Sequence, residues 1–232
     1  MVAFHFKFFY SWHMTKPTQD TASCAKAAGR PKASEVEARI NELTEVAARL
    51  FLKHGYTGVS LETIAREARV AVRTIYVKFG GKAGLLNAVL LSGRDRFFGV
   101  CDMDSDSRPL REVIDHFARH FYDLLCAPEA VSMQRVVIAE APGNPELANT
   151  FYEAGPKLTQ EMLERFFARP DVRAQMRDDV PLALLPTHLV NCIAGDQVRR
   201  FLFPDAQPPR EQALRELDQR LDLFYRSVLR AN

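Results

Sequence analysis

The chain has 232 residues, 47% of them hydrophobic and 26% charged, with a formal net charge of +2. These values are ordinary for a globular protein, and no apolar stretch reaches the ~18 residues that a membrane-spanning helix requires. The four cysteines are scattered, with no C-x-x-C pair and no Cys/His cluster at zinc spacing, which argues against a disulfide scaffold and a zinc site. The sequence therefore predicts a cytoplasmic protein with free thiols, no membrane partner and no cofactor.

Charge is distributed unevenly along the chain. Residues 29–100 carry 12 Lys and Arg against 7 Asp and Glu, whereas residues 101–232 carry 16 against 21. A basic segment joined to an acidic one indicates that the first contacts a polyanion and the second does not. The alternative is a chance asymmetry of solvated surfaces.

Residues 1–33 are predicted to form an N-terminal arm, which is flexible because residues 15–33 are polar and rich in helix breakers. Residues 1–13 are aromatic-rich and precede a second methionine, Met14. We interpret them as a leader that arises from the choice of start site; the alternative is a hydrophobic arm that docks on the body. Arg30 and Lys32 could lie along phosphates or reach a minor groove, unless they belong to a solvated tail.

The first helix is predicted from residue 34. Residues 34–37 read S-E-V-E, which is a capping box, and Gly55 ends the helix. Its apolar side chains recur at helical spacing: Ile40, Leu43, Ala47, Leu50 and Phe51. This helix supplies a core for the elements that follow.

Two short helices joined by a tight turn come next. Ser60 caps the first by accepting a hydrogen bond from a free amide of its first turn. The apolar face of that helix consists of Leu61, Ile64, Ala65 and Ala68. In the second helix Ile75 and Phe79 lie four apart and point one way. Basic and hydroxyl side chains project elsewhere, namely Arg73, Thr74 and Lys78. This layout is that of a helix-turn-helix reader.

A further helix is predicted to begin at Lys82 and to end near Gly99. A lysine at a helix N-terminus opposes the macrodipole, unless an outside anion binds the ammonium and the free amides together. We therefore expect Lys82, with Thr74 and Tyr76, to hold phosphate. Arg73 is expected to contact a guanine edge in the major groove, and Lys78 to do either. The alternatives are a solvated Arg73 and a partly buried Tyr76. The whole predicted DNA-binding set is Arg30, Lys32, Ser60, Arg73, Thr74, Tyr76, Lys78 and Lys82.

The reader segment resembles a known family. Residues 73–89, R-T-I-Y-V-K-F-G-G-K-A-G-L-L-N-A-V, are similar to the TetR/AcrR regulators, whose motif runs approximately T-[LIV]-Y-x-[HY]-F-[GP]-[SG]-K-x-x-L. The matching positions are Thr74, Ile75, Tyr76, Phe79, Gly80, Gly81, Lys82 and Leu85. The preceding I-A-R-E-A-R-V resembles the family's I-A-x-x-A-G-V. Arg69 stands where the family has a turn glycine at positive φ, and Ala71 stands where Ser or Thr caps the reading helix, so that helix start should be weaker.

Beyond a polar loop at residues 101–109, every long segment is predicted to be helical. We expect helices at 110–127, 130–140, 145–167, 182–202 and 210–230. Pro128 and Pro142 are expected to stop the helix before each of them, and Gly155-Pro156 to kink the third. No segment alternates at period two, so the predicted fold is all-α. Its predicted domains are the arm 1–33, a helix-turn-helix DNA-binding domain 34–100, and a helical effector-binding and dimerisation domain 101–232.

Residues 135–156 resemble the AefR-like group of TetR relatives, which implies that the C-terminal domain binds an effector. Phe, Leu and Met side chains in this part suggest an apolar or amphipathic effector. The predicted lining is Phe117, Phe121, Phe151, His188 and Asn191. Core packing explains the phenylalanines equally well, and the two polar residues could instead lie at a subunit interface. His116 and His120 have a spacing that can bind metal, but no third ligand is nearby, so no metal site is predicted.

The last helix carries a strong apolar stripe: Leu214, Leu217, Leu221, Phe224 and Val228. In the resembled family the last two helices of two protomers form a four-helix interface. A two-fold dimer is also what a helix-turn-helix reader requires to bind a palindrome. The stripe is therefore the predicted dimer interface, and the alternative is that it completes the core of a monomer.

No Gly-rich phosphate loop, G-x-S-x-G motif or carboxylate pair supports an enzyme, and no catalytic residue is predicted. The sequence predicts a dimeric, ligand-responsive transcriptional regulator, a repressor released from a palindromic DNA operator by a small effector. Two alternatives remain. One is an architectural DNA-binding protein without sequence preference, and the other is an all-helical ligand carrier or enzyme without DNA binding.

Overall fold

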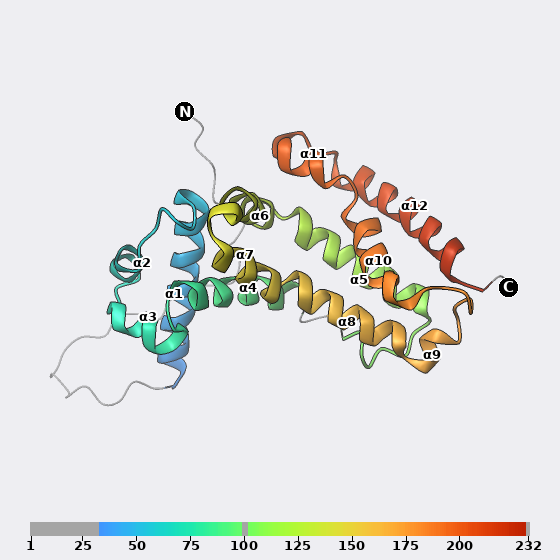
Figure 1. The fold of residues 1–232 in the computed structure, drawn as a ribbon, viewed down its shortest axis with the longest axis horizontal. Helices are drawn as coiled ribbons and strands as arrows, with labels where there is room; N and C mark the ends of the chain where they lie inside the picture. Colours follow the sequence, from blue (N-terminus) through green and yellow to red (C-terminus); the bar gives the residue numbers. More distant parts are fainter. Residues whose placement is uncertain (1–32, 99–101, 231–232) are drawn as a thin grey trace, which may run out of the picture.

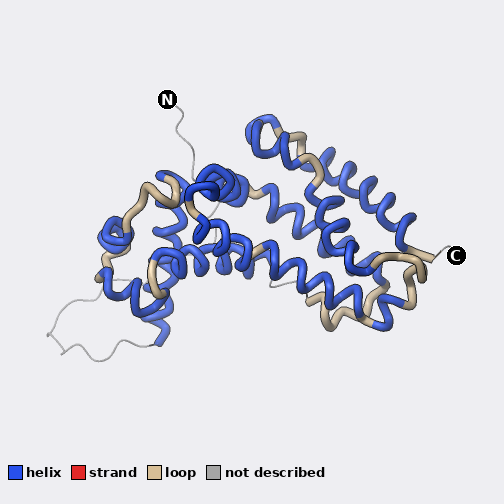
Figure 2. The backbone as a smooth tube through the Cα atoms, in the orientation of Figure 1, coloured by secondary structure: helices blue, strands red, loops and turns tan. Residues whose placement is uncertain are grey.

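A computed structural model of the protein describes residues 33–98 and 102–230, which are helices joined by short loops (Figures 1 and 2). No strand occurs in these two ranges apart from an isolated bridge between Met176 and Leu229, so the all-α prediction is confirmed. The predicted leader, Arg30 and Lys32 lie outside the described residues. So do the side chains of residues 34–36 in the expected capping box.

The first part of the chain forms four helices at one end of an elongated molecule (Figure 1). These are α1 (Ala33–His54), α2 (Leu61–Glu67), α3 (Val72–Phe79) and α4 (Lys82–Phe98). The Ser60 hydroxyl caps α2 by accepting a hydrogen bond from the Thr63 amide at 3.2 Å, as predicted. In this group α2 packs against α1 and α3, and α4 packs against α1 and α3.

The second part is a bundle of helices that extends to the other end of the molecule (Figure 1). It consists of α5 (Leu110–Cys126), α6 (Pro128–Glu140), α7 (Pro145–Ala154), α8 (Pro156–Ala168), α9 (Pro170–Arg173), α10 (Leu185–Ala194), α11 (Gln197–Leu202) and α12 (Arg210–Val228). Single 3₁₀ turns occur at Ala141–Gly143, Leu182–Leu184 and Pro204–Ala206. None of the described helices combines the length and the hydrophobicity needed to cross a bilayer.

Prolines mark the boundaries of helices in this bundle. α5 ends at Cys126 and α6 at Glu140, before Pro128 and Pro142 as predicted, and Pro128 is also the first residue of α6. The expected kink at Gly155-Pro156 is instead a break, because Pro156 begins a separate helix, α8. The reason is that proline has no amide hydrogen to lose in a first turn, and its φ is already helical. Pro145 and Pro170 open α7 and α9 in the same way.

The helix expected over residues 182–202 is divided in two. Gly195 has φ +59°, a left-handed conformation that ends α10. Asp196 then caps α11 by accepting a hydrogen bond from the Arg199 amide at 2.9 Å. The glycine and the capping carboxylate together make a sharp corner, and an apolar stripe alone did not reveal it.

Buried side chains form two hydrophobic clusters. One lies among α5, α8, α10 and α12, and includes Phe117, Phe166 and Phe224. The other is the core of the first four helices, but it also contains Met133, Val137 and Leu147 from α6 and α7. The loop at residues 101–109 therefore does not separate the two cores, because helices from beyond it pack directly on the first part.

Candidate nucleic-acid interface

The turn between α2 and α3 is built without its usual glycine. Arg69 adopts φ +54°, which is the left-handed conformation predicted for that position. Ala65 and Ala68 are 2% and 5% exposed, so small side chains lie where the two helices approach each other. The Val70 amide donates to the Ala65 carbonyl at 2.9 Å, which closes the turn.

The start of α3 is weakly capped, as expected for an alanine. No side chain of Ala71 can accept a hydrogen bond, and only its carbonyl takes part, accepting from the Thr74 amide at 2.8 Å. Free first-turn amides at the start of α3 remain available to an outside acceptor.

The two sides of α3 differ completely. Ile75 is 0% exposed and packs into the first core, with Phe79 partly buried beside it. Arg73 and Val77 are four residues apart and exposed, so they share the outward face. Tyr76 and Lys78 are exposed on the two flanks of that face, and Thr74 is half-buried next to Arg73. The structure thus places four residues of the predicted DNA-binding set, together with Val77, on one solvent-facing surface.

Val77 is a residue that the sequence reasoning missed. Its side chain is 71% exposed, which is unusual for a valine in a helix with an available core. A solvent-facing apolar group beside an arginine suits the methyl group of thymine in a major groove. The signal was present in the four-residue spacing from Arg73, but an apolar residue is assigned to the core by default.

Two glycines set how α3 meets α4. Gly80 has φ +77° and caps α3, its amide donating to the Tyr76 carbonyl at 2.9 Å. Gly84 lies in α4, and a Cβ atom there would be 1.7 Å from the Phe79 carbonyl oxygen. Only glycine permits this approach of the α4 backbone to the end of α3, so Gly84 is a second residue that motif matching did not single out.

Lys82 is the first residue of α4, directly after the turn that ends α3. Its ammonium lies 4.5 Å from the centroid of the Tyr56 ring, and the side chain is half-buried. Burial lowers the pKa of Lys82, and the nearby Glu140 carboxylate opposes that change. Tyr56 is 3% exposed, and burial, followed by the charges of Glu146 and Glu140, raises its pKa to about 12.

The last residue of α6 holds the loop between α1 and α2. The Glu140 carboxylate accepts hydrogen bonds from the Tyr56 amide at 2.9 Å, the Thr57 amide at 2.7 Å and the Thr57 hydroxyl at 2.6 Å. Partial burial raises the pKa of Glu140, but these hydrogen bonds outweigh it, and the net pKa is lowered. We call this set of contacts the Glu140 clamp.

Glycine is required next to the Glu140 clamp. Gly55 has φ +77°, and a Cβ atom there would lie 2.5 Å from the Glu140 carboxylate. The clamp thus joins the C-terminal bundle to the loop that carries Tyr56, and Tyr56 in turn lies under Lys82. The sequence contained both segments, but nothing in it placed residues 57 and 140 together.

Comparison with protein families identifies this arrangement. Residues 43–89 match the family of bacterial regulatory proteins of the TetR type, and residues 112–227 match the C-terminal domain of AefR-like transcriptional repressors. The chain belongs to the TetR family of transcriptional regulators. Its helix-turn-helix is therefore a DNA-binding domain.

Individual TetR-family proteins resemble the chain at moderate identity. The transcriptional repressor AcnR of Corynebacterium diphtheriae is 26% identical over 162 residues, which are 70% of this chain and 80% of AcnR. A TetR-family regulator from Mesorhizobium loti superposes with a TM-score of 0.69 at 22% identity, over 84% of this chain and 98% of that one. The flavonoid-responsive regulator FrrA gives a TM-score of 0.67 at 21% identity, over 84% and 100% of the two chains. The last two likenesses show a shared fold.

The residues predicted to line an effector pocket are not gathered around one cavity. Phe117 and Phe121 are buried and stacked, with ring centroids 5.3 Å apart, in the C-terminal core. Phe151 packs against the other core, that of the DNA-binding domain. His188 is exposed and lines a cavity of about 370 Å³ between α10 and the end of α12, and Asn191 is exposed on α10. The phenylalanines pack in the two cores, and a role of these five residues in effector binding stays a prediction.

The stripe predicted as a dimer interface faces inward. Leu217, Leu221, Phe224 and Val228 are each at most 2% exposed, and Leu214 is partly buried against the same cluster. These side chains complete the core of the protomer, as in the alternative above, so they do not present a surface to a second copy. The outward face of α12 carries Leu223, which is 67% exposed.

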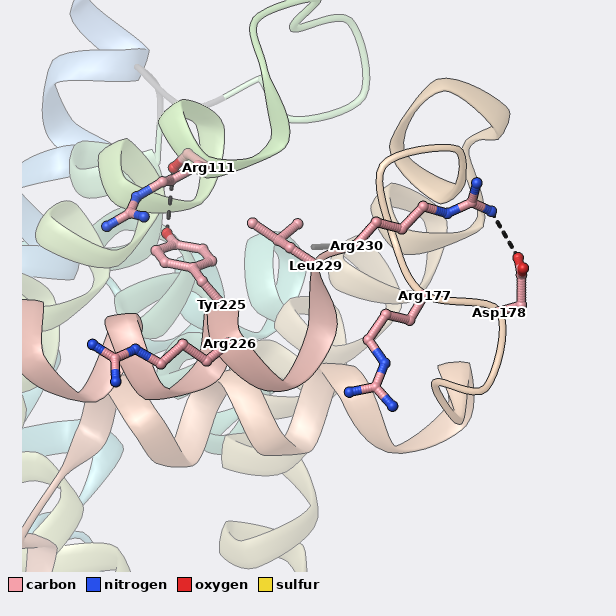
Figure 3. A pocket seen from close by; sticks show the side chains of 7 residues that line it. All are labelled: Arg111, Arg177, Asp178, Tyr225, Arg226, Leu229 and Arg230. Carbon is pink, nitrogen blue, oxygen red and sulfur yellow. Dashed lines mark hydrogen bonds and ion pairs between the residues drawn. The ribbon is translucent and has the colours of Figure 1, made fainter. Parts of the chain in front are cut away.

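A surface cavity of about 730 Å³ lies at the end of α12, far from α3 (Figure 3). Most of its cationic lining is paired with carboxylates: Arg111 with Asp222, Arg177 with Asp179 and Arg230 with Asp178. Tyr225 forms one wall and donates its hydroxyl to Asp115 at 2.6 Å. These pairs nearly neutralise the lining.

His116 and His120 lie with ring centroids 4.4 Å apart, and His120 Nδ1 is 2.8 Å from the His116 carbonyl oxygen. Within the described ranges, no group of three or more His, Cys, Asp or Glu side chains could hold a metal ion. The pair is explained by helix geometry and gives no metal site.

Proposed function

We propose that this TetR-family regulator is a homodimeric repressor that binds a palindromic operator and leaves it when a small effector binds the C-terminal bundle. The observation that carries the proposal is the outward face of α3. Arg73 and Lys78 form no ion pair with any residue in the described ranges. The opposite side of the same helix is anchored in the core by Ile75. A cationic, unpaired helix face is suited to phosphates and guanine edges.

A dimer is required by the geometry of the ligand. One α3 reads only a few base pairs, and a palindrome presents its two half-sites about one helical turn apart. Because the apolar stripe of α12 is already used inside the protomer, we assign the contact to the outward faces of α10 and α12. Leu184, in the turn that immediately precedes α10, and Leu223 on α12 are exposed apolar residues there, at 63% and 67%.

The release step is supported by the way the two parts are joined. Met133, Val137 and the Glu140 clamp link α6 to the DNA-binding domain. A shift of α6 would therefore displace the reader. An effector can act only through its different affinity for the two arrangements. A regulator of the same fold, FrrA, is named flavonoid-responsive, and for this chain we propose an apolar or amphipathic effector. Because it acts on the chromosome, we place the protein in the cytoplasm.

The test is a footprint of the purified full chain on the DNA upstream of its own gene, with and without candidate ligands. We expect protection of a palindrome at low salt, loss of protection as salt rises, and loss again with an active ligand. Uniform binding to all sequences would instead indicate an architectural protein. Ligand binding without any protection of DNA would indicate a carrier or an enzyme.

A further inference from the structure

Arg200 and Arg220 are among the arginines of the C-terminal bundle that form no ion pair with a carboxylate in the described ranges. Arg200 on α11 is only 4% exposed, and its Nε atom is buried without a hydrogen-bond partner. Its guanidinium donates to the Ala194 carbonyl, and Arg220 Nε on α12 donates to the Cys192 carbonyl at 2.6 Å. Within the described ranges, neither arginine forms an ion pair.

The carboxylates nearest in the sequence are committed elsewhere. Asp196 caps α11 through the Arg199 amide. Asp123 pairs with Arg210 at 2.8 Å, and Asp218 pairs with Arg119 at 2.7 Å. The protein therefore provides no carboxylate of its own, in the described ranges, for two cations of which one is fully enclosed.

The end of α10 compensates only part of this charge. Both guanidinium groups bind carbonyls in its last turn, where the helix macrodipole places roughly half a negative charge. Two full positive charges face it, and only that of Arg220 is partly exposed to water, so the charge of Arg200 is incompletely compensated. A buried charge without compensation is strongly unfavourable, and one oxyanion would remove most of the imbalance.

A hydroxyl donor and partly exposed neighbours accompany the two arginines. The Arg200 guanidinium lies 5.9 Å from the centroid of the Tyr122 ring. Burial raises the pKa of Tyr122 to about 12, and a hydrogen bond with Cys126 acts in the same direction, so the hydroxyl keeps its proton near neutral pH. Tyr122, Cys126 and Arg220 are each partly exposed, which leaves this side of the cluster accessible.

We propose that Arg200, Arg220 and Tyr122 form a binding site for the carboxylate or phosphate group of an amphipathic small molecule. The guanidinium forks bind the oxygens, the tyrosine hydroxyl donates to them, and the apolar body lies along the partly buried Tyr122, Leu125 and Cys192. Resting on the proposed function, this assigns the effector an anionic head group.

The location of the site suits an effector. Tyr122 and Cys126 lie in the last turns of α5, immediately before α6 begins, and α11 packs on α6. The other end of α6 carries the Glu140 clamp. A helix of 13 residues spans about 20 Å, so α6 connects the anion site to the DNA-binding domain as a single rigid element.

The experiment measures the thermal stability of the full chain, without DNA, in a buffer free of other oxyanions. The probes are sodium octanoate, octyl phosphate and, as a neutral molecule with the same tail, octan-1-ol. We expect octanoate or octyl phosphate at ten times its dissociation constant to raise the folding equilibrium constant about elevenfold, and octanol to have little effect. Whichever anion acts at the lower concentration identifies the head group.

Three variants locate the response. Arg200→Met and Arg220→Met should each abolish it, whereas Arg215→Met, on the outer face of α12 where Arg215 pairs with Glu211, should keep it. Because Met removes an uncompensated charge, the unliganded Arg200→Met protein is expected to be at least as stable as the unliganded parent. If Arg200→Met does not fold, the half-buried Arg220→Met provides the same test.

A parent protein that gains nothing from either anion, or an Arg220→Met protein that gains as much as the parent, overturns the proposal. The arginines would then be structural caps of α10. This readout is independent of the footprint. A protein that octanoate stabilises but that protects no DNA would support the anion site and refute the repressor. A protein that protects an operator but is stabilised by neither anion would support the repressor and refute the anion site.

Discussion

The two ends of the molecule treat their cations differently. In the C-terminal bundle, many exposed arginines are paired with aspartates on neighbouring helices or in the same loop: Arg111 with Asp222, Arg119 with Asp218, Arg210 with Asp123 and Arg177 with Asp179. On α3, Arg73 and Lys78 have no such partner in the described part of the chain. Exposed ion pairs contribute at most ~1 kcal/mol each to the free energy of unfolding. Their main effect here is that the aspartates cancel the electrostatic field of the arginines. Because the cations of α3 are unpaired and lie together on one exposed helix, their field is available to an external anion.

The two cores differ as well. The C-terminal core is made from its own helices, whereas the core of the DNA-binding domain includes Met133, Val137 and Leu147 from α6 and α7. The reader is therefore positioned by the bundle, through apolar contacts and through the Glu140 clamp. This dependence gives the bundle a way to control DNA binding, and the predictions below separate the reader's own geometry from the support it receives.

The largest effect is expected from Gly84→Ala. The new methyl group would lie 1.7 Å from the Phe79 carbonyl oxygen, so α3 must move relative to α4. We expect the free energy of unfolding to fall by about 3 kcal/mol and operator binding to be lost. Urea unfolding and fluorescence anisotropy with operator DNA measure the two quantities.

Gly93→Ala is the matched control in the same helix. A Cβ atom at Gly93 meets nothing within 4 Å, so this change should stabilise α4 by up to about 1 kcal/mol through helix propensity. Equal behaviour of the two alanine variants would contradict the assigned contact between Gly84 and the end of α3.

Arg73→Ala comes next, because it removes a base contact without disturbing the fold. We expect operator affinity to fall by about 1–3 kcal/mol and base preference to relax at one position of each half-site. Lys78→Ala should instead lower the affinity for all DNA sequences alike and reduce the number of counterions released on binding by about one. Arg215→Ala, whose guanidinium pairs with Glu211 at 2.6 Å, should change neither. An Arg73 variant with unaltered sequence preference would disprove direct readout.

Glu140→Gln tests the support from the bundle. The amide cannot accept all three hydrogen bonds, so the clamp should weaken by about 1–2 kcal/mol, seen as faster hydrogen exchange at the Tyr56 and Thr57 amides. Glu153→Gln, which affects only an exposed pair with Lys157, is the control. If exchange at Thr57 is the same in both variants, the clamp contributes nothing.

The clamp also has a defined pH dependence. The folded-state pKa of Glu140 is lowered from its ordinary 4.5. Its contribution is therefore fully present above the ordinary value, and it is lost as pH falls through the lowered one. Protection of the Thr57 amide should follow that titration in the parent protein and be independent of pH in Glu140→Gln.

The smallest effect on the protomer is expected from Leu223→Glu. Leu223 is 67% exposed, so the free energy of unfolding of the protomer should change by less than about 0.5 kcal/mol. The dissociation constant of the dimer should rise. Sedimentation equilibrium measures that shift. Leu221→Ala, at a position 2% exposed, should behave oppositely and destabilise the protomer by about 2–5 kcal/mol. A Leu223→Glu protein with unchanged association would place the dimer contact elsewhere.

Much of the DNA-binding domain could be predicted from the sequence, because its rules are local. Ser60 as a cap and the buried Ile75 follow from residues within one turn of each position, whereas the positive φ of Arg69 was expected from the resemblance to the family. Val77 was missed because exposure of an apolar residue depends on which face the core occupies. Gly84 was missed because its role is a contact between two helices.

The bundle was less predictable for the same reason. Its helices were expected from apolar periodicity, but periodicity does not say what a face packs against. The stripe of α12 was assigned to a partner protomer and lies in the protomer's own core. Phe151 was grouped with Phe117 and instead packs on the DNA-binding domain.

By itself, the sequence determined the helical class, the helix-turn-helix and its cationic face, since each depends on spacing and side-chain chemistry along a few consecutive residues. Only the tertiary structure decided that α6 reaches the loop at Tyr56 and that Arg200 is enclosed without a carboxylate. Both are consequences of how separate helices come together, and the free energy of such contacts depends on partners that are distant in the chain.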